Sequence, residues 1–357
     1  VSVEGIQSLL GFGLAAGLLA AYLARGGEAS GALLLTYWAL HMPAHGQELM
    51  LLARQYPGHR NVTLRLLEPL GAREEGDAEA CEDSWGHAST PPIVPNQGVA
   101  IALEEVSVRA GGHTILTDLN LALAPGSHVA IVGPSGAGKS SLVGLLLGWH
   151  RAATGRVLVE GRPLDDQHLA WVRQVTAWVD PAVQLWNRTL LDNLGYGGTD
   201  TPAALVALAL TQADLRDVLD RLPDGLQTPM GEGGGLVSGG EGQRVRFGRA
   251  LVRRGVRLVI LDEPFRGLDH EQRCVLLQRA LQLWSTATVL CITHDVGVTQ
   301  TFDRVLVVES GRIIEDGVPT SLAACPETRY RALLDAESTA HEGLWTSGVW
   351  RRLRQRR

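Results

Sequence analysis

The stretch GPSGAGKSS, from Gly133 to Ser141, decides the fold of this chain. It matches the pattern G-x-x-x-x-G-K-[ST], in which a glycine-rich loop surrounds phosphate groups. The apolar run HVAIV precedes it and the helical pattern SLVGLLLG follows it, which is the strand–loop–helix context that the pattern requires. Gly136 and Gly138 can adopt backbone conformations closed to other residues, so that backbone N–H groups approach a phosphate. A chance glycine turn would not explain the Lys-Ser pair in this context.

The side chains of this loop indicate a nucleotide together with a metal ion. Lys139 supplies a point charge for the β- and γ-phosphates, and Ser140 is placed to bind Mg²⁺. The amino end of the following helix adds partial positive charge. We therefore expect nucleotide contacts from Gly133, Ser135, Gly136, Gly138, Lys139, Ser140 and Ser141.

A second motif, LVILDE from Leu258 to Glu263, ends in two carboxylates. We expect Asp262 to hold Mg²⁺, directly or through water, and Glu263 to orient and deprotonate an attacking water. The alternative is a strand that merely ends in an acidic turn. The phosphate loop earlier in the chain argues against that alternative, because the two motifs together form one kind of site.

The region around both motifs, residues 99–335, alternates strand and helix patterns, which predicts an α/β domain. The runs IALEEVSV and ILTDLNLAL alternate apolar and polar residues, as half-buried strands do. The runs HVAIVG, RLVILDE and ATVLCITH are continuously apolar, which is typical of buried parallel strands.

A third motif, VSGGEGQRVRFGRAL from Val237 to Leu251, lies between the first two. Its SGGEGQR closely resembles the signature motif of ATP-binding cassette (ABC) ATPases. ITHD resembles the switch-histidine segment of that family, with His294 in the histidine position, and RGLD resembles its D-loop, with Asp269. The resemblance covers about residues 99–335 and implies a P-loop NTPase domain of ABC type with a helical signature subdomain.

The resemblance implies that two such domains dimerise head to tail, with each ATP held between the phosphate loop of one and the signature loop of the other. Since SGGE opens a helix, the N–H groups there form an anion site. The implied nucleotide contacts at this loop are Ser238, Gly239 and Gly240. The implied catalytic residues for Mg-ATP hydrolysis are Glu263, His294 and Lys139, with His294 touching the γ-phosphate.

Two positions depart from the family pattern. The family usually has Gln after the strand that leads to its coupling loop, whereas AWVDPAVQLW places Asp180 there; Gln184 is a neighbouring alternative that the alignment disfavours. Asp180 can still reach toward Mg²⁺ or its water. The family stacks adenine on an aromatic residue where this chain has Ala110, a loss of about 1–3 kcal/mol if nothing replaces it. Both departures motivate a second hypothesis, a catalytically weak regulatory half paired with a better partner subunit.

The stretch GIQSLLGFGLAAGLLAAYLA, from Gly5 to Ala24, carries no charge. About 20 such residues suffice to cross a bilayer as a helix, and no basic region precedes them as in a signal sequence. A second apolar segment, Ala29 to Ala53, contains more polar residues. The pair resembles the last two transmembrane helices of an ABC exporter, and GEGG at residues 231–234 strengthens that likeness. A buried helical hairpin packed on a soluble domain is the alternative.

We therefore expect a partial transmembrane domain at residues 1–70, a linker at 71–98, an ABC nucleotide-binding domain at 99–335 and a basic tail at 336–357. Further membrane helices would precede Val1. The expected location is the cytoplasmic membrane, multi-pass, with the nucleotide-binding domain in the cytoplasm. The expected partners are a second nucleotide-binding domain, in a homo- or heterodimer, and a transported substrate that no residue here identifies.

Composition bears on the remaining classes. The 357 residues carry a net charge of −6 without a basic excess, so nucleic-acid binding finds no support. The four cysteines show no metal-binding spacing. A soluble ABC ATPase that acts on nucleic acid is a third hypothesis. The apolar N terminus and the short interval between the nucleotide motifs, which leaves no room for a long coiled coil, argue against it.

Overall fold

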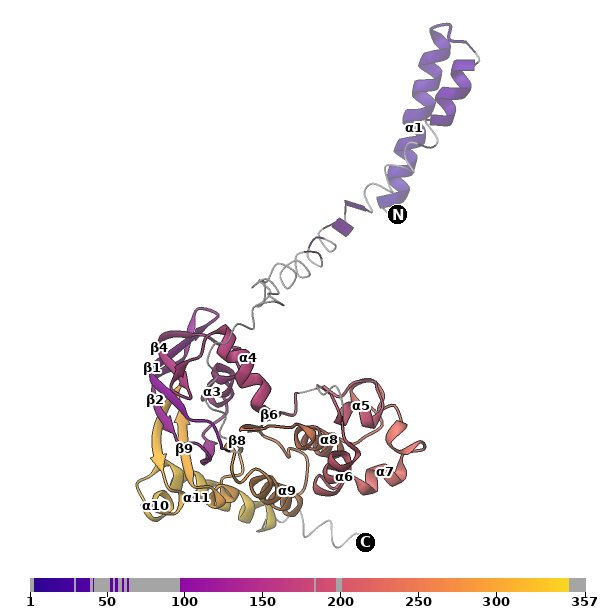
Figure 1. Cartoon of the computed structure of the whole chain (residues 1–357). Coiled ribbons are helices and arrows are strands. Elements are labelled where there is room, and N and C mark those ends of the chain that lie inside the picture. Colours follow the sequence, from indigo (N-terminus) through magenta and orange to yellow (C-terminus); the bar gives the residue numbers. More distant parts are fainter. Residues whose placement is uncertain are drawn as a thin grey trace. The chain divides into compact units, whose positions relative to one another are not determined.

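The computed structural model divides the chain into two compact units, Val1–Pro91 and Pro92–Arg357. The described residues are 3–28, 30–38, 41, 52–53, 55–56, 60, 63, 97–182, 184–196 and 201–346. In the first unit, α1 (Val3–Ala24) is a helix where the sequence predicts one, and residues 30–38 are helical (Figure 1). Across the described residues, no helix combines the length and the apolar character needed to span a membrane.

The second unit is built around two β-sheets (Figure 1). The first is antiparallel, with the strand order β2-β1-β4-β5. Its strands are β1 (Ile101–Ala110), β2 (His113–Leu123), β4 (Ala152–Val159) and β5 (Arg162–Pro163). The second sheet has the order β10-β9-β3-β8-β7-β6 and is parallel except for β10. Its strands are β3 (His128–Val132), β6 (Thr176–Val179), β7 (Leu258–Asp262), β8 (Thr288–Ile292), β9 (Arg304–Glu309) and β10 (Arg312–Gly317).

Helices and short 3₁₀ turns connect and cover these strands. The helices are α3 (Lys139–Leu146), α4 (Asp166–Val175), α5 (Leu190–Leu194), α6 (Ala203–Gln212), α7 (Arg216–Arg221), α8 (Gly239–Val252), α9 (His270–Leu283), α10 (Pro319–Ala324) and α11 (Arg329–Thr346). The 3₁₀ turns are η1 (Gly225–Gln227), η2 (Glu232–Gly234) and η3 (Gly297–Thr301). Strands and helices alternate along most of this unit, so the predicted α/β class is confirmed.

The three central strands explain why the sequence forms this sheet. Every residue of β7 and β8 is buried, and β3 is buried after its first residue. Apolar side chains on both faces of a strand require cover on both sides, which parallel sheets receive from their crossover helices. The continuous apolar runs therefore become the centre of the parallel sheet, as predicted, and the alternating runs become β1 and β2.

The predicted limits of the domains fall near, but not at, the limits of elements. The strand β1 begins at Ile101, two residues after the predicted start of the domain at 99. The last helix, α11, runs to Thr346 and so continues past residue 335 into the region predicted as a basic tail. Residues 347–357 of that tail, and residues 64–96 with most of the predicted linker, lie outside the described residues.

A helical part, α5 to α8, lies beside the parallel sheet and carries the SGGE segment at the start of α8 (Figure 1). The ring of Phe247 on α8 is completely buried. It meets Phe265 and Trp284 edge to face, at centroid distances of 5.3 and 5.8 Å. Since Phe265 follows β7 and Trp284 ends α9, this aromatic cluster fixes α8 to the strand that ends in the two carboxylates.

We expect Phe247→Ala to lower the free energy of unfolding by about 3–5 kcal/mol, because it removes a buried ring and leaves a cavity. Urea unfolding followed by tryptophan fluorescence measures the loss. The matched control is Leu236→Ala, whose side chain is 60% exposed. Equal unfolding midpoints for the two variants would contradict the packing role of Phe247.

Candidate functional site

The phosphate loop connects β3 to α3, and its glycines are required by its shape. Gly133 has a φ of 145°, and a Cβ atom there would lie 2.0 Å from the carbonyl oxygen of Val308. Gly138, which precedes the first residue of α3, has a φ of 100°, and a Cβ atom would lie 2.8 Å from Leu116. The loop therefore follows this path only with glycine at both positions.

Lys139 begins α3 and is 6% exposed. Its Nζ donates hydrogen bonds to the carbonyl oxygens of Gly133, at 2.9 Å, and Pro134, at 2.8 Å. Burial lowers the pKa of this amine, while the negative charges of Glu263 and Asp262 raise it. Lys139 is the only lysine among the 357 residues, so the phosphate loop carries the chain's single ammonium side chain.

The carboxylates that follow the parallel strands gather beside this loop. Asp262, at the end of β7, is 8% exposed and hydrogen-bonds to Ser140. Burial raises the pKa of Asp262, the hydrogen bond from Ser140 lowers it, and the charges of Asp180 and Glu263 raise it further. Burial also raises the pKa of Asp180, which follows β6 and whose Oδ1 accepts a 2.5 Å hydrogen bond from the N–H of Ala182. Three carboxylates thus influence one another at one edge of the sheet.

This cluster fits a divalent cation that is completed by other ligands. Hydroxyl and carboxylate oxygens, as in Ser140 and Asp262, are ligands that Mg²⁺ prefers, and Mg²⁺ usually binds to one or two carboxylates plus phosphate and water. In the described part of the chain, no group of three or more His, Cys, Asp or Glu side chains is arranged to hold a metal alone. The residues therefore suit a cation that arrives with phosphate oxygens.

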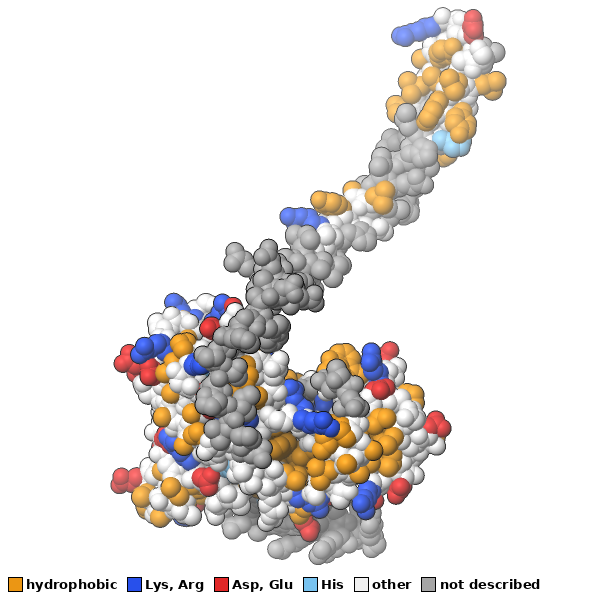
Figure 2. All heavy atoms as spheres, in the orientation of Figure 1, with side chains coloured by type: hydrophobic (Ala, Val, Ile, Leu, Met, Phe, Trp, Pro, Cys, Tyr) orange, Lys and Arg blue, Asp and Glu red, His pale blue; other side chains and the backbone are white. Residues whose placement is uncertain are grey.

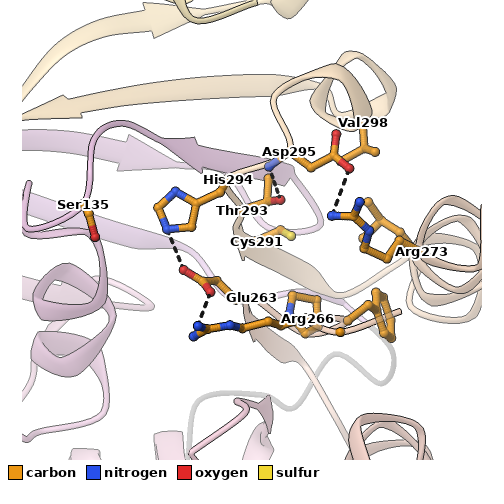
Figure 3. Close-up of a pocket in the computed structure, with 13 residues that line it drawn as sticks. Ser135, Glu263, Arg266, Arg273, Cys291, Thr293, His294, Asp295 and Val298 are labelled. Atoms are coloured by element: carbon orange, nitrogen blue, oxygen red, sulfur yellow. Dashed lines mark hydrogen bonds and ion pairs between the residues drawn. The ribbon is translucent and has the colours of Figure 1, made fainter. Parts of the chain in front are cut away.

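Glu263 and His294 form a close pair at the centre of a pocket of about 400 Å³ (Figure 3). The Nε2 atom of His294 lies 2.6 Å from Oε1 of Glu263. Glu263 has a φ of 44°, in the left-handed region that costs energy for a residue other than glycine, and its N–H donates to the carbonyl of Ile292 at 2.9 Å. Ser135 of the phosphate loop lines the same pocket. A strained, fixed carboxylate beside a phosphate loop is suited to orienting a water molecule.

The signature residues lie in a different pocket. Ser238 caps the start of α8, and its hydroxyl accepts from the N–H of Glu241 while the Glu241 side chain accepts from the N–H of Ser238. Asp269 caps α9 by accepting from the N–H of Gln272 at 2.8 Å. Ser238, Gly239, Gly240 and Asp269 line this second pocket, and among the residues that line it none belongs to the phosphate loop. The predicted nucleotide contacts thus form two groups within one chain.

The structure also shows where the remaining predicted positions lie. Gly136 has a φ of 78° and open space around its Cβ direction, and Ser141 lies in the first turn of α3. Ala110 ends β1 and pairs across the hairpin with His113, whose side chain is exposed. The strands β1 and β2 contain no Phe, Tyr or Trp. Gln184 is exposed, whereas Asp180 lies within electrostatic range of Asp262 and Glu263.

Two arginines belong to the site although sequence reasoning did not select them. Arg266 lies within the RGLD segment and lines both pockets. Arg246 on α8 lines the second pocket, and its charge lowers the pKa of Asp180. The one available signal was the presence of an arginine within or near a named motif, which does not indicate where a long side chain points.

Comparison with known proteins agrees with this geometry. Residues 116–266 match the sequence family described as ABC transporter. This domain belongs to the ABC transporter family. It is an ABC-type ATPase domain, and a domain of this type implies binding of ATP.

Curated relatives carry the same domain. An ATP-dependent lipid A-core flippase of Ralstonia nicotianae is 37% identical over 256 residues, which are 68% of this chain and 43% of the relative. A protein of the same name from Xylella fastidiosa is 37% identical over 212 residues, 59% of this chain and 36% of the relative. The chain therefore spans less than half the length of these relatives.

A solved structure extends the likeness beyond the ABC domain. A bacterial Atm1-family ABC exporter with ATP bound is similar with a TM-score of 0.67 and 27% identity. The similarity covers 93% of this chain and 57% of that one. Because it covers nearly the whole chain, it includes residues from both compact units.

We expect Lys139→Ala to weaken the binding of Mg-ATP at least tenfold, because it removes the ammonium group that faces the phosphates. Equilibrium titration with a fluorescent ATP analogue measures the affinity. The control is Arg151→Ala, which removes an exposed cation paired with Asp166. If Lys139→Ala bound the analogue as tightly as the control, the loop would not be the nucleotide site.

Proposed function

We propose that this chain is the ATP-hydrolysing part of an ABC exporter, which couples Mg-ATP hydrolysis to movement of a substrate across the cytoplasmic membrane. The observation that carries the proposal is the contact of 2.6 Å between Glu263 and His294 beside the phosphate loop. Lys139 binds the phosphates, Ser140 and Asp262 hold Mg²⁺, and Asp180 reaches its water. Glu263 orients and deprotonates the attacking water, while His294 holds Glu263 and contacts the γ-phosphate.

The arrangement in two pockets supports a head-to-tail dimer with a second nucleotide-binding domain. The amino end of α8 offers free N–H groups at Gly239 and Gly240, which attract anions. Of the phosphate loop, Ser135 lines the other pocket, and no residue of that loop, all of which the structure describes, lines the pocket of the signature residues. The signature residues therefore serve the ATP of a partner domain, and each nucleotide is completed by two chains.

The first unit supports a membrane domain. Apolar side chains along the helices there are exposed, among them Phe12, Leu14, Leu18, Leu33 and Leu34. Figure 2 shows hydrophobic side chains along the N-terminal segment of the chain. Exposed apolar surface of this extent needs cover by lipid or by other helices, and the solved exporter matches nearly the whole chain. We propose residues 1–70 as the last part of a transmembrane domain, with 71–98 as linker, 99–335 as the nucleotide-binding domain in the cytoplasm and 336–357 as the tail.

A second candidate is a regulatory half with weak catalysis in a heterodimeric transporter. Two observations favour it. Asp180 adds a third carboxylate to an already negative site, and burial and the charges of neighbouring carboxylates raise the pKa of both Asp180 and Asp262. Ala110 supplies no ring for adenine to stack on.

We expect Glu263→Gln to abolish Mg-ATP turnover of the detergent-purified chain while ATP binding is kept, because the amide cannot accept the proton of the attacking water. Phosphate release and equilibrium ATP binding are the two measurements. The matched control is Glu327→Gln, an exposed carboxylate between α10 and α11. Negligible turnover of the unmodified chain together with ATP binding would favour the regulatory half.

We expect the chain to remain in the membrane fraction after a wash at high salt and to be released by detergent. A charge at the centre of a membrane helix costs about 2.5–3.5 kcal/mol on insertion scales, so Leu14→Asp should reduce the membrane-bound fraction. Fractionation followed by immunoblotting measures it, with Leu236→Asp as the control in the second unit. A chain released by salt alone would contradict membrane insertion.

A further inference from the structure

The side chain of Arg266 occupies an unusual place, between the two pockets and beside Glu263. Its residue lines the pocket that contains Glu263 and His294, and also the pocket that contains the signature residues. Its Nη1 lies 3.8 Å from Oε2 of Glu263, while His294 contacts the other oxygen of the same carboxylate. Figure 3 shows the arginine and the histidine reaching Glu263 from different sides.

The backbone of Arg266 is held by hydrogen bonds while its side chain is exposed. The N–H of Arg266 donates to the carbonyl of Glu263 at 3.2 Å, and the N–H of Leu268 donates to Phe265 at 3.2 Å, so consecutive turns hold this segment. The side chain of Arg266 is nevertheless 74% exposed. Arg273, which lines the same pocket, is 35% exposed and lies 3.3 Å from Asp295.

The pairing of Arg266 with Glu263 is weak. A distance of 3.8 Å exceeds the 2.7–3.2 Å of an N–H···O hydrogen bond, so the contact is an ion pair without one. Exposed ion pairs of this kind contribute little to stability. A stronger acceptor within reach of the guanidinium would therefore displace the carboxylate.

The γ-phosphate of ATP is such an acceptor. Phosphate oxygens match the planar donor fork of a guanidinium, which can donate two parallel hydrogen bonds to them. Ser135 of the phosphate loop and Arg266 line the same pocket, so nucleotide phosphates at that loop come within the reach of Arg266. We propose that Arg266 is a further ATP-binding residue, whose guanidinium leaves Glu263 for the γ-phosphate of ATP bound to the same chain.

This transfer has a consequence for the proposed hydrolysis. While Arg266 faces Oε2 of Glu263, its guanidinium occupies the space on one side of that oxygen. Once the guanidinium moves to the γ-phosphate, Oε2 is free to accept a hydrogen bond from water. The move of Arg266 to the γ-phosphate thereby leaves more room at this oxygen for the attacking water. The inference rests on the proposed function, because it assigns a residue to the same ATP site.

The test separates the phosphate contact from the contact with Glu263. Glu263→Gln removes the ion pair and turnover, so ATP and ADP affinities can be measured at equilibrium. In this background we expect Arg266→Ala to weaken ATP binding at least tenfold and ADP binding less than twofold, because ADP lacks the γ-phosphate. Arg266→Lys keeps the charge but not the fork, and should recover part of the ATP affinity. The matched control is Arg331→Ala, which removes an exposed cation paired with Asp335.

Three outcomes would overturn the inference. Equal ATP affinities with and without Arg266, in variants whose melting temperatures match, would show that the side chain only pairs with Glu263. Equal losses for ATP and ADP would place Arg266 away from the γ-phosphate. A loss confined to concentrations at which the chain dimerises would assign Arg266 to the partner's nucleotide. If the unmodified chain binds ATP but does not hydrolyse it, the proposed hydrolysis is wrong, while the ATP/ADP comparison still decides the role of Arg266.

Discussion

The parallel pairing of β3, β8 and β7 is the constraint on which the site depends. Ala130 and Leu261 both pair with Cys291, so the three strands run in one direction and end at one edge. Loops after the carboxyl ends of neighbouring parallel strands meet in space although they are distant in sequence. The phosphate loop follows β3, the two carboxylates end β7, and His294 follows β8. Burial of these strands therefore assembles the catalytic groups.

The same edge concentrates negative charge. Asp262 and Glu263 act on one ammonium group, that of Lys139, and burial opposes the charged forms of both Lys139 and Asp262. A cation that brings its own ligands would offset the repulsion among these carboxylates, and Mg²⁺ bound to nucleotide phosphates is such a cation. The negative charges of these carboxylates also attract the ammonium group of Lys139, which donates hydrogen bonds to two carbonyl oxygens of the loop. The proposed affinity for Mg-ATP would thus have the same origin as the electrostatic repulsion at this edge.

The sequence predicted the parts of this structure that local chemistry determines. The glycine pattern of the phosphate loop, the continuous apolar strands and the helix start at SGGE each follow from a few neighbouring residues, and each lies in its predicted element. The approach of Arg266 to Glu263 could not be predicted, because it depends on the turn after β7 and on the rotamers of a long side chain. The end of α11 was also missed, since the helix continues beyond residue 335 and through Gly343 to Thr346. The membrane crossing of Gly5–Ala24 and the roles of the site residues stay proposals.

The turn after β7 contributes to both pockets, because Arg266 lines each of them. Glu263 lines the first pocket and Asp269 lines the second. The backbone hydrogen bonds of Arg266 and Leu268 hold the segment between them in consecutive turns. Gly267, at a φ of 90°, lies against the signature helix: a Cβ atom on Gly240 would be 3.4 Å from its carbonyl oxygen. Gly267 therefore connects the turn that begins at Glu263 directly to the start of the signature helix. Because packed segments of this kind shift between discrete positions rather than stretch, a backbone shift at Glu263 would reach Gly240 as a displacement of the whole turn.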